Sequence, residues 1–440
     1  MTQSGWGRYP VHSAQVFAPR TIGALADRVQ AGSMIARGNG RAYGDSAISL
    51  QNTVHMRHFN RLIAFDPATG QVVAEAGILL ADIIHTFLPQ GWFPAVTPGT
   101  KFVTLGGMIA ADVHGKNHHI DGSFGSFLDW IDVMDAQGAV IRCSAQENTD
   151  LFEWSVGGMG LTGVILRAAF RLRPVETAWI KQTTLPAANL DTAITLLERS
   201  VEAPYSVAWI DCLSRGSKLG RSLVMLGEHA AQTDLTARQS QNRFASGAKR
   251  AKSVPFNLPS GLLNSMAIRA FNTLYHWRGS RKTGTQLVDW DRYFYPLDAV
   301  LGWNKIYGRK GFAQFQCVLP PDNARPGLHA LLGAVSSAGA GSFLAVLKRF
   351  GAQQGRFSFP MPGYTLALDF PVNPRTLALM THLDQITLAH GGRFYLAKDS
   401  RMTAETLRAS DPRTDHFVQM RADAALRPVF ASAQSERLDL

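Results

Sequence analysis

Three glycine-rich segments of this chain could bind a nucleotide through their backbone, and the first is a sharp turn. Residues 37–45 read RGNGRAYGD, with three glycines within seven residues. Glycines at this density let the backbone turn tightly and point several N–H groups at one spot, which is the geometry of an anion-binding nest. A pyrophosphate suits such a nest. Taken alone, a glycine-rich loop is more often only a turn.

The second and third segments are rich in small residues. Residues 98–117 place a run of glycine and alanine ahead of His114, against which a flat ring could lie; tight packing of two elements is the alternative. Residues 157–165 (GGMGLTGVI) loosely match the glycine pattern of a dinucleotide-binding fingerprint. That fingerprint follows a strand and opens a helix, whereas this segment leads into a strand. The match to that fingerprint therefore fails.

The elements around these segments predict an α+β fold. Alternating residues and turn residues predict hairpins over 61–77 and 130–142 and a strand over 164–172, and a helical pattern covers 78–90. The regular order of one helix per parallel strand, expected of a doubly wound fold, is missing. Further along, we predict strands at 206–212, 313–319 and 364–370, and helices at 188–202, 325–338 and 374–390.

Length and composition divide the chain into domains. The 440 residues suit two domains better than one core, and the composition changes after Pro174. We predict a first domain over 1–175 and a substrate domain over 176–390. A C-terminal segment, 391–440, is predicted to return to the first domain.

Cysteine usage and the lack of targeting signals favour the cytoplasm. Cys143, Cys212 and Cys317 are far apart and odd in number, which argues against a disulfide framework or a zinc site. His118 and His119 are adjacent and would point in different directions on a strand, so we predict no metal site. The start of the chain shows no signal peptide, and no apolar run approaches the ~18 residues of a membrane span. Any membrane contact would be peripheral.

Net charge is +11, which favours an anionic partner, and much of it lies in one segment. Between Leu235 and Val288 there are nine Lys or Arg and no Asp or Glu, interleaved with large apolar residues. We place a mobile basic insertion near 229–288. Two interpretations are open. The segment is a solvated insertion, or it forms the entrance of a binding site for a ligand with a phosphate and an apolar tail at a membrane surface. The basic residues fit no nucleic-acid recognition motif, so we expect no nucleic acid.

Taken together, the order and spacing of the three glycine segments resemble the FAD-binding domain of the vanillyl-alcohol oxidase and p-cresol methylhydroxylase (PCMH-type) family. Further segments resemble the branch of that family that oxidises the 2′-hydroxyl of a polyprenyl-phosphoryl-β-D-ribose. The resemblance runs from about Arg37 to Leu440 and implies a two-domain PCMH-type fold with an antiparallel-sheet substrate domain. These further segments are 114–119 (HGKNHH), 122–125 (GSFG), 209–211 (WID), 295–298 (YPLD), 314–316 (QFQ) and 395–401 (YLAKDSR).

The resemblance implies that FAD is the cofactor and is held non-covalently. Many relatives attach the flavin through a His in the first glycine segment, where this chain has Arg41. The residues that the resemblance assigns to the cofactor are Arg37, Gly38, Asn39, Gly40, Arg41, Ala42, Tyr43, Gly44, Asp45, Gly99, Thr104, Leu105, Gly106, Gly107, Ala111, Asp112, Val113, His114, Ile165 and Tyr395.

The resemblance also implies a reacting face. A flavin accepts a hydride, so the protein must position a carbinol and take its hydroxyl proton. Lys398 is the candidate, as a neutral amine that acts as base or as an ammonium that anchors the developing alkoxide. A surface ion pair with Asp399 is the alternative reading. The catalytic residues implied are Lys398, His114 and Tyr43, and the substrate-binding residues are Lys116, Gln314, Gln316, Lys348 and Lys398.

Three positions of the substrate pocket depart from the pattern of this branch. Ala367 stands where mycobacterial relatives have Cys, Phe294 where a Tyr is expected, and Thr365 where Asn is expected. The resemblance implies a separate short-chain reductase that reduces the keto sugar, which completes the epimerisation to arabinose for the cell wall. Oxidation of a soluble alditol or aldonolactone is the alternative within the same class. A non-enzymatic protein that binds anionic lipid is the alternative from another class.

Overall fold

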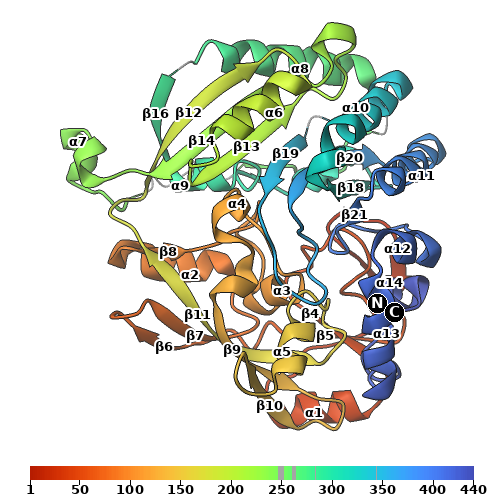
Figure 1. Cartoon of the computed structure of the whole chain (residues 1–440). Helices are drawn as coiled ribbons and strands as arrows, with labels where there is room; N and C mark the ends of the chain where they lie inside the picture. The colour runs from red at the N-terminus through yellow and green to blue at the C-terminus, as the bar shows by residue number, and fades with distance from the viewer. Residues whose placement is uncertain (246–251, 260–263, 283, 343) are drawn as a thin grey trace.

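The computed structural model describes residues 1–245, 252–259, 264–282, 284–342 and 344–440. Figure 1 shows a large sheet with its helices in the upper half, a first domain below it, and the C-terminal helices along one side of the first domain. None of the helices in these ranges is both long enough and apolar enough to span a bilayer.

The first domain is built on two sheets. An antiparallel sheet has the order β10-β9-β11-β7-β6, with β8 also paired to β11, and a small parallel sheet has the order β3-β5-β4. The hairpins predicted over 61–77 and 130–142 are present as β6–β7 and β9–β10. The strands are β3 (Gln15–Phe17), β4 (Met34–Arg37), β5 (Asn52–His55), β6 (Leu62–Asp66), β7 (Gln71–Glu75), β8 (Trp92–Pro94), β9 (Leu128–Met134), β10 (Val140–Ser144) and β11 (Val164–Pro174).

Short helices connect and cover these strands. They are α1 (Ile22–Gln30), α2 (Leu80–Phe87), α3 (Leu105–Ala110), α4 (His118–Asp121) and α5 (Thr149–Ser155), and a hairpin of β1 (Thr2–Ser4) and β2 (Val11–Ser13) opens the chain. The strand expected at His118 and His119 was wrong, because these residues begin α4. The two rings still have different partners: His118 contacts Gln353 at 2.9 Å and His119 contacts the carbonyl of Ala203 at 3.0 Å.

The second domain is an eight-stranded sheet in which every described pairing is antiparallel. Its order is β16-β12-β14-β13-β19-β20-β18-β21. The strands are β12 (Trp179–Ala187), β13 (Tyr205–Ile210), β14 (Ser222–His229), β16 (Gly284–Asp289), β18 (Phe312–Leu319), β19 (Ala345–Phe350), β20 (Gly363–Pro371) and β21 (Arg393–Phe394).

The two faces of this sheet have different roles. Residues directly opposite each other on neighbouring strands share a face. The row Ala208, Leu347, Leu366 and Cys317 faces the main apolar core, together with α6 (Leu190–Arg199), α10 (Pro321–Ala338) and α11 (Pro374–Ala389). The adjacent row, Trp209, Val346, Ala367 and Gln316, faces the other way, toward the first domain.

Helix α10 begins four residues earlier than predicted. The pattern predicted 325–338, whereas the helix starts at Pro321 and contains Pro326. Pro321, at the first helical position, loses little, because the first four N–H groups lack intrahelical partners in any case. Pro326 is the sixth residue of the helix and removes one intrahelical hydrogen bond. Burial of Ala324 and Leu328 in the core favours the longer helix.

The segment predicted as a mobile insertion near 229–288 contains packed structure. It includes α7 (Ala237–Ser240), β15 (Lys252–Ser253), the sixteen-residue α8 (Ser265–Ser280) and β16. Strand β15 pairs with β17 (Val300–Leu301), and α8 packs on β12 and β14. A short helix, α9 (Trp290–Phe294), follows. The described residues of this segment do not include 246–251, 260–263 and 283, so Leu262 and Leu263 lie outside them.

After β21 the chain crosses to the first domain. The helices there are α12 (Ala404–Ser410), α13 (Arg413–Asp423) and α14 (Ala433–Leu438). Met34 at the start of β4 forms a bridge with Phe430, and Ala433 donates its backbone N–H to the carbonyl of Ile48 at 2.7 Å. The C-terminal segment is therefore attached on both sides of the first glycine-rich turn.

Candidate active site

A cavity of about 310 Å³ lies between the glycine-rich segments and the open face of the eight-stranded sheet. All three glycine segments reach it, although they are far apart in the sequence. The predicted cofactor residues that line it are Gly38, Asn39, Gly40, Arg41, Ala42, Tyr43, Gly99, Thr104, Gly106, Gly107, Ala111, Val113, His114, Ile165 and Tyr395. The predicted substrate residues that line it are Gln314, Gln316, Lys348 and Lys398.

Missing side chains let these segments approach each other closely. A Cβ at Gly38 would lie 2.1 Å from Oγ1 of Thr104, and a Cβ at Gly106 would lie 2.9 Å from Cβ of Ala76. Thr104 caps α3, because its Oγ1 accepts the N–H of Gly107 at 3.3 Å. The start of α3 is thus pressed against the turn after β4 at Gly38 and against the end of β7 at Gly106, and glycine is required at both contacts.

The lining of the cavity fits a large, flat nucleotide such as FAD. Small residues form much of the wall on the first-domain side, including Ala36, Ala76, Ala110 and Gly163. Small residues let a planar ring lie against the backbone. Arg41 supplies a cation at the edge: its guanidinium lies 4.0 Å from the ring centroid of Trp6 and 5.0 Å from that of Phe102.

Six side chains with hydrogen-bonding groups line the other end of the cavity: Tyr43, His114, Gln314, Gln316, Thr365 and Lys398. Nζ of Lys398 lies 3.5 Å from the ring centroid of Tyr43. Nε2 of Gln316 is 3.3 Å from Nε2 of His114 and donates to Oγ1 of Thr365 at 3.2 Å. Gln314 and Gln316 alternate along β18, so both reach the cavity from the same face of the sheet.

Asp369 belongs to this group and was not anticipated from the sequence. It follows Thr365 and Ala367 on the same face of β20, is fully buried, and accepts a hydrogen bond from Nε2 of Gln314. Its second carboxylate oxygen has no hydrogen-bond partner among the described residues. The sequence could have indicated this position, because residues 365, 367 and 369 alternate along β20 and so share one face, whereas the other face of the strand is apolar.

The electrostatics of this end favour a neutral amine. Lys398 and Lys348 are half-buried, and the part that stays open faces the cavity rather than bulk water. Burial lowers the pKa of Lys398; Asp369 opposes this effect and Lys348 adds to it. Burial raises the pKa of Asp369, partly offset by the hydrogen bond from Gln314 and by Lys398. Burial also lowers the pKa of Lys348 to about 8.

His114 stays neutral in this setting. Burial lowers its pKa well below the ordinary value, and Lys348, His118 and Lys398 lower it further. Its ring lies 4.8 Å from Phe350 and 5.1 Å from Tyr395, measured between centroids. Nδ1 of His114 is buried without a hydrogen-bond partner among the described residues. His114 is therefore a neutral donor or acceptor, not a cation.

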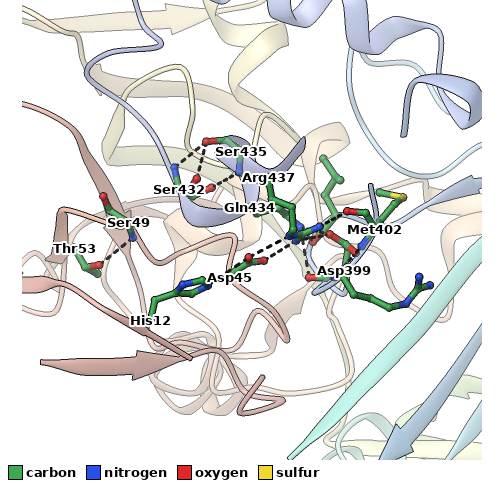
Figure 2. Close-up of polar contacts among 12 residues, drawn as sticks. His12, Asp45, Ser49, Thr53, Asp399, Met402, Ser432, Gln434, Ser435 and Arg437 are labelled. Atoms are coloured by element: carbon green, nitrogen blue, oxygen red, sulfur yellow. Dashed lines mark hydrogen bonds and ion pairs between the residues drawn. The ribbon is translucent and has the colours of Figure 1, made fainter. Parts of the chain in front are cut away.

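Arg437 fixes the segment that carries Lys398, as Figure 2 shows. Its Nη2 lies 2.8 Å from Oδ1 of Asp45 and 2.9 Å from Oδ2 of Asp399. Asp399 also accepts the N–H groups of Arg401 and Met402 and the amide of Gln434. The surface ion pair between Lys398 and Asp399, the alternative reading of this sequence, is absent from the described contacts.

The partners of Asp399 keep it ionised despite its burial. Burial alone would raise its pKa, but Arg437 and the backbone donors outweigh burial and lower it below the usual range. Gly44 lets the turn come close, since a Cβ there would lie 1.9 Å from the carbonyl oxygen of Asp399. Tyr43 adds a backbone hydrogen bond to Ala397 at 2.9 Å.

Six predicted site residues do not line the cavity. Gly44 and Asp45 belong to the contact with the C-terminal segment described above. Arg37 braces the turn from behind, with hydrogen bonds to the carbonyls of Ala47 and Ser4, and Leu105 lies in the apolar core. Asp112 accepts from Ser123 at 2.7 Å and from the N–H of Gly125 at 2.8 Å.

Lys116 and Phe294 do not line the cavity. Nζ of Lys116 donates to the carbonyl of Tyr293 and lies 4.0 Å from the ring centroid of Tyr293. Burial lowers its pKa to about 7, with Lys348 adding to the effect. Phe294 is stacked on Phe93 at 5.3 Å in an aromatic cluster. Of the three departures from the expected pattern, only Thr365 and Ala367 reach the cavity.

The three cysteines do not line the cavity. Cys143, Cys212 and Cys317 are buried and unpaired, and burial raises their pKa values to about 11, 12 and 12. Within the described ranges, no group of three or more His, Cys, Asp or Glu is placed to hold a metal ion.

Comparison with known proteins decides the family. A model of an FAD-binding domain matches residues 13–144. The chain is 36% identical to decaprenylphosphoryl-β-D-ribose oxidase of Mycolicibacterium smegmatis, over 99% of this chain and 97% of that protein. It belongs to the same family of FAD-dependent oxidoreductases.

Two further proteins show similarity to this chain. A protein of Streptomyces coelicolor without an assigned activity is 34% identical over 82% of this chain and 100% of its own length. L-gulonolactone oxidase of Mus musculus is 27% identical over 42% of this chain and 44% of its own length. Membership of the family confirms the PCMH-type α+β fold, the FAD cofactor and an oxidoreductase activity predicted from the sequence.

The contact made by Arg437 predicts a large effect on stability. Changing Arg437 to Met leaves two buried carboxylates without their cation and should lower the free energy of unfolding by about 3 kcal/mol. Arg427→Met is the matched control, because Arg427 pairs with the exposed Asp439 and should change stability by about 0–1 kcal/mol. Urea unfolding measures both; equal shifts of the two midpoints would contradict a structural role for Arg437.

The setting of Arg41 predicts a cofactor that is not covalently attached. No Cys lines the cavity among the described residues, and Arg41 occupies the position of the attachment His. Acid precipitation of the yellow protein should leave all flavin absorbance in the supernatant. A coloured pellet would show a covalent bond, and His114 would then be the residue to examine.

Proposed function

We propose that this protein oxidises the 2′-hydroxyl of a polyprenyl-phosphoryl-β-D-ribose to a ketone. The observation that carries the proposal is the similarity to decaprenylphosphoryl-β-D-ribose oxidase, which extends over 99% of the chain and therefore covers both domains. The arrangement of polar and cationic groups in the cavity supports it.

The sugar is proposed to bind against β18. Gln314 and Gln316 present amide groups from one face, and Thr365 holds the amide of Gln316 at 3.2 Å. Amide side chains both donate and accept, which suits neighbouring hydroxyls of a ribose. Ala367 and Thr365 are both small, so they leave space beside the sugar.

The phosphate is proposed to bind Lys348. This lysine lines the cavity and has no carboxylate within ion-pair distance among the described residues. A half-buried cation without a counter-ion favours an anionic ligand. A bound phosphate would in turn raise the pKa of Lys348 from about 8 and keep it charged.

Lys398 is proposed as the base for the 2′-hydroxyl. A neutral amine is needed, and burial lowers the pKa of Lys398 toward that state. Asp369, with one carboxylate oxygen unpartnered, can take part in the same proton equilibrium. His114 and Tyr43 border the reacting end, His114 as a neutral hydrogen-bonding group and Tyr43 as the surface beneath the amine.

FAD, when bound, would supply the two-electron acceptor for the hydride of the carbinol carbon. The side chains then have to hold the hydroxyl near Lys398 and remove its proton. The carbinol thus loses one hydride and one proton, which balances its oxidation to a ketone.

We further propose a place for this reaction. The keto sugar requires a reductase of the short-chain class to complete epimerisation. A polyprenyl substrate resides in a bilayer, so we propose that the protein works on the cytoplasmic side, in peripheral contact with the membrane surface.

A soluble polyol is the second candidate substrate, because L-gulonolactone oxidase is among the relatives. We expect a short-chain polyprenyl-phosphoryl-β-D-ribose to bleach the flavin absorbance under anaerobic conditions, whereas alditols and gulonolactone should not. Stopped-flow absorbance measures both. Bleaching by the polyol alone would reverse the order of the two candidates.

The role of Lys398 predicts a specific pH dependence. With the amine as base, the bleaching rate should rise with pH and level off once Lys398 is neutral. Lys398→Arg keeps the charge but cannot lose its proton, so the rate should fall by about 10²–10⁴-fold. A wild-type rate in Lys398→Arg would instead assign the ammonium as an anchor for the alkoxide.

Asp369 predicts the direction in which this pH profile moves. Its carboxylate raises the pKa of Lys398, so Asp369→Asn should shift the midpoint of the rate profile to lower pH. A merely structural role for Asp369 would change the amplitude and leave the midpoint in place. Lys305→Arg, on a lysine that donates to the carbonyl of Val254 away from the cavity, is the control.

A further inference from the structure

Helix α8 (Ser265–Ser280) exposes a row of large apolar side chains. Met266, Leu274 and Trp277 are 79%, 51% and 48% exposed. With Ala270 and Thr273 they line a shallow groove along one side of the helix. Counted from Met266, these residues lie four, seven, eight and eleven positions further along, which places them on one face of the helix. Ile268 and Asn272 are buried on the opposite face. The outward side of the helix therefore carries large apolar side chains that the rest of the fold does not bury.

The charges around this row are all of one sign. Arg269 lines the groove itself, and Arg278, Arg281 and Lys282 follow at the C-terminal end. The guanidinium of Arg281 lies 3.8 Å from the ring centroid of Trp277. No acidic residue occurs between 235 and 288. An ordinary solvated helix mixes both signs, as α13 does with Asp415 and Arg421.

The elements packed against α8 add little negative charge to this surface. Asp211, the acid nearest to the helix in the hydrogen-bond network, is buried and is bound by Arg221 and by the amide of Asn272. Arg221 also donates to Thr273 at 3.1 Å. The exposed side of α8 is thus cationic and apolar together.

The position of α8 links this surface to the cavity. A Cβ at Gly279 would lie 2.1 Å from Leu223, and Tyr275 lies 4.6 Å from Trp209 between ring centroids. Leu223, Trp209 and Val346 are opposite one another on β14, β13 and β19, and Val346 lines the cavity. Helix α8 therefore packs on the cavity side of the sheet, two strand spacings, or about 10 Å, from the cavity wall.

We propose that α8 is an interfacial helix that docks the protein on an anionic bilayer and holds the cavity beside it. Trp and Leu side chains on one face and Arg and Lys around them are the composition of helices that lie in the headgroup region. The cations match the negative surface of anionic lipids. The inference rests on the proposed function in one respect: a polyprenyl-phosphate sugar is drawn from that bilayer.

The experiment is co-sedimentation of the FAD-loaded, full-length protein with vesicles of phosphatidylcholine alone or mixed with phosphatidylglycerol. We expect binding to the mixed vesicles only, weakened by salt. The variant Met266→Ser/Leu274→Ser/Trp277→Ser should weaken binding at least ten-fold. Arg269→Gln/Arg281→Gln should weaken it by about five-fold per charge removed. Retained flavin absorbance shows that each variant is folded.

The matched control removes exposed apolar residues elsewhere. Ile63 and Val140, on β6 and β10, are 48% and 40% exposed and lie in the first domain. Ile63→Ser/Val140→Ser should bind vesicles like the wild type. Equal loss of binding in this control and in the α8 variants would overturn the assignment to α8, as would failure of the wild type to bind anionic vesicles.

Turnover of a short-chain, water-soluble substrate analogue separates the docking proposal from the proposed function. The α8 variants should oxidise this analogue at the wild-type rate, because no residue changed lines the cavity. Vesicle binding without turnover of the analogue would retain the docking surface and contradict the substrate. Turnover without vesicle binding would retain the substrate and overturn the docking surface.

Discussion

One guanidinium between two buried carboxylates connects the parts of this molecule that have to act together. Arg437 contacts Asp45, which ends the first glycine turn, and Asp399, which is the neighbour of Lys398. The turn belongs to the first domain, and the segment with Lys398 follows directly on the last strand of the second sheet. The position of the turn relative to the amine of Lys398 is therefore held by the two ion pairs of Arg437, together with the backbone hydrogen bond from Tyr43 to Ala397 and the close approach at Gly44.

Burial has opposite consequences for the two kinds of charge in this region. Around Arg437, opposite charges are in direct contact, so Asp399 stays ionised although it is inside the protein. Lys398 and Lys348 line the cavity, and burial lowers the pKa of each; Lys348 adds to the lowering at Lys398. The same low polarity thus gives a rigid ion pair at one end of the segment and a titratable amine at the other, separated by one peptide bond.

The sequence predicted the features that depend on local pattern. Glycine density indicated the turn that lines the cavity, alternation located the hairpins β6–β7 and β9–β10, and the alternate placing of Gln314 and Gln316 put both on one face. The features it did not predict depend on contacts between distant residues. The sequence does not distinguish Asp369 from other acidic residues, because its contact with Gln314 depends on the pairing of β20 with β18. The contact of Arg437 with Asp45 likewise depends on the C-terminal segment returning to the first domain. Proline at the start of α10 and the short α4 were decided by core burial and local geometry that patterning does not encode.

The separation of Asp45 and Arg437 along the chain also bears on how the protein is made. The two residues are 392 positions apart, so at 5–20 residues per second the ribosome delivers Arg437 roughly 20–80 s after Asp45. During that interval the newly made turn lacks the contact that later fixes it. The contact between the turn and the segment that carries Lys398 can therefore form only after nearly the whole chain has been synthesised.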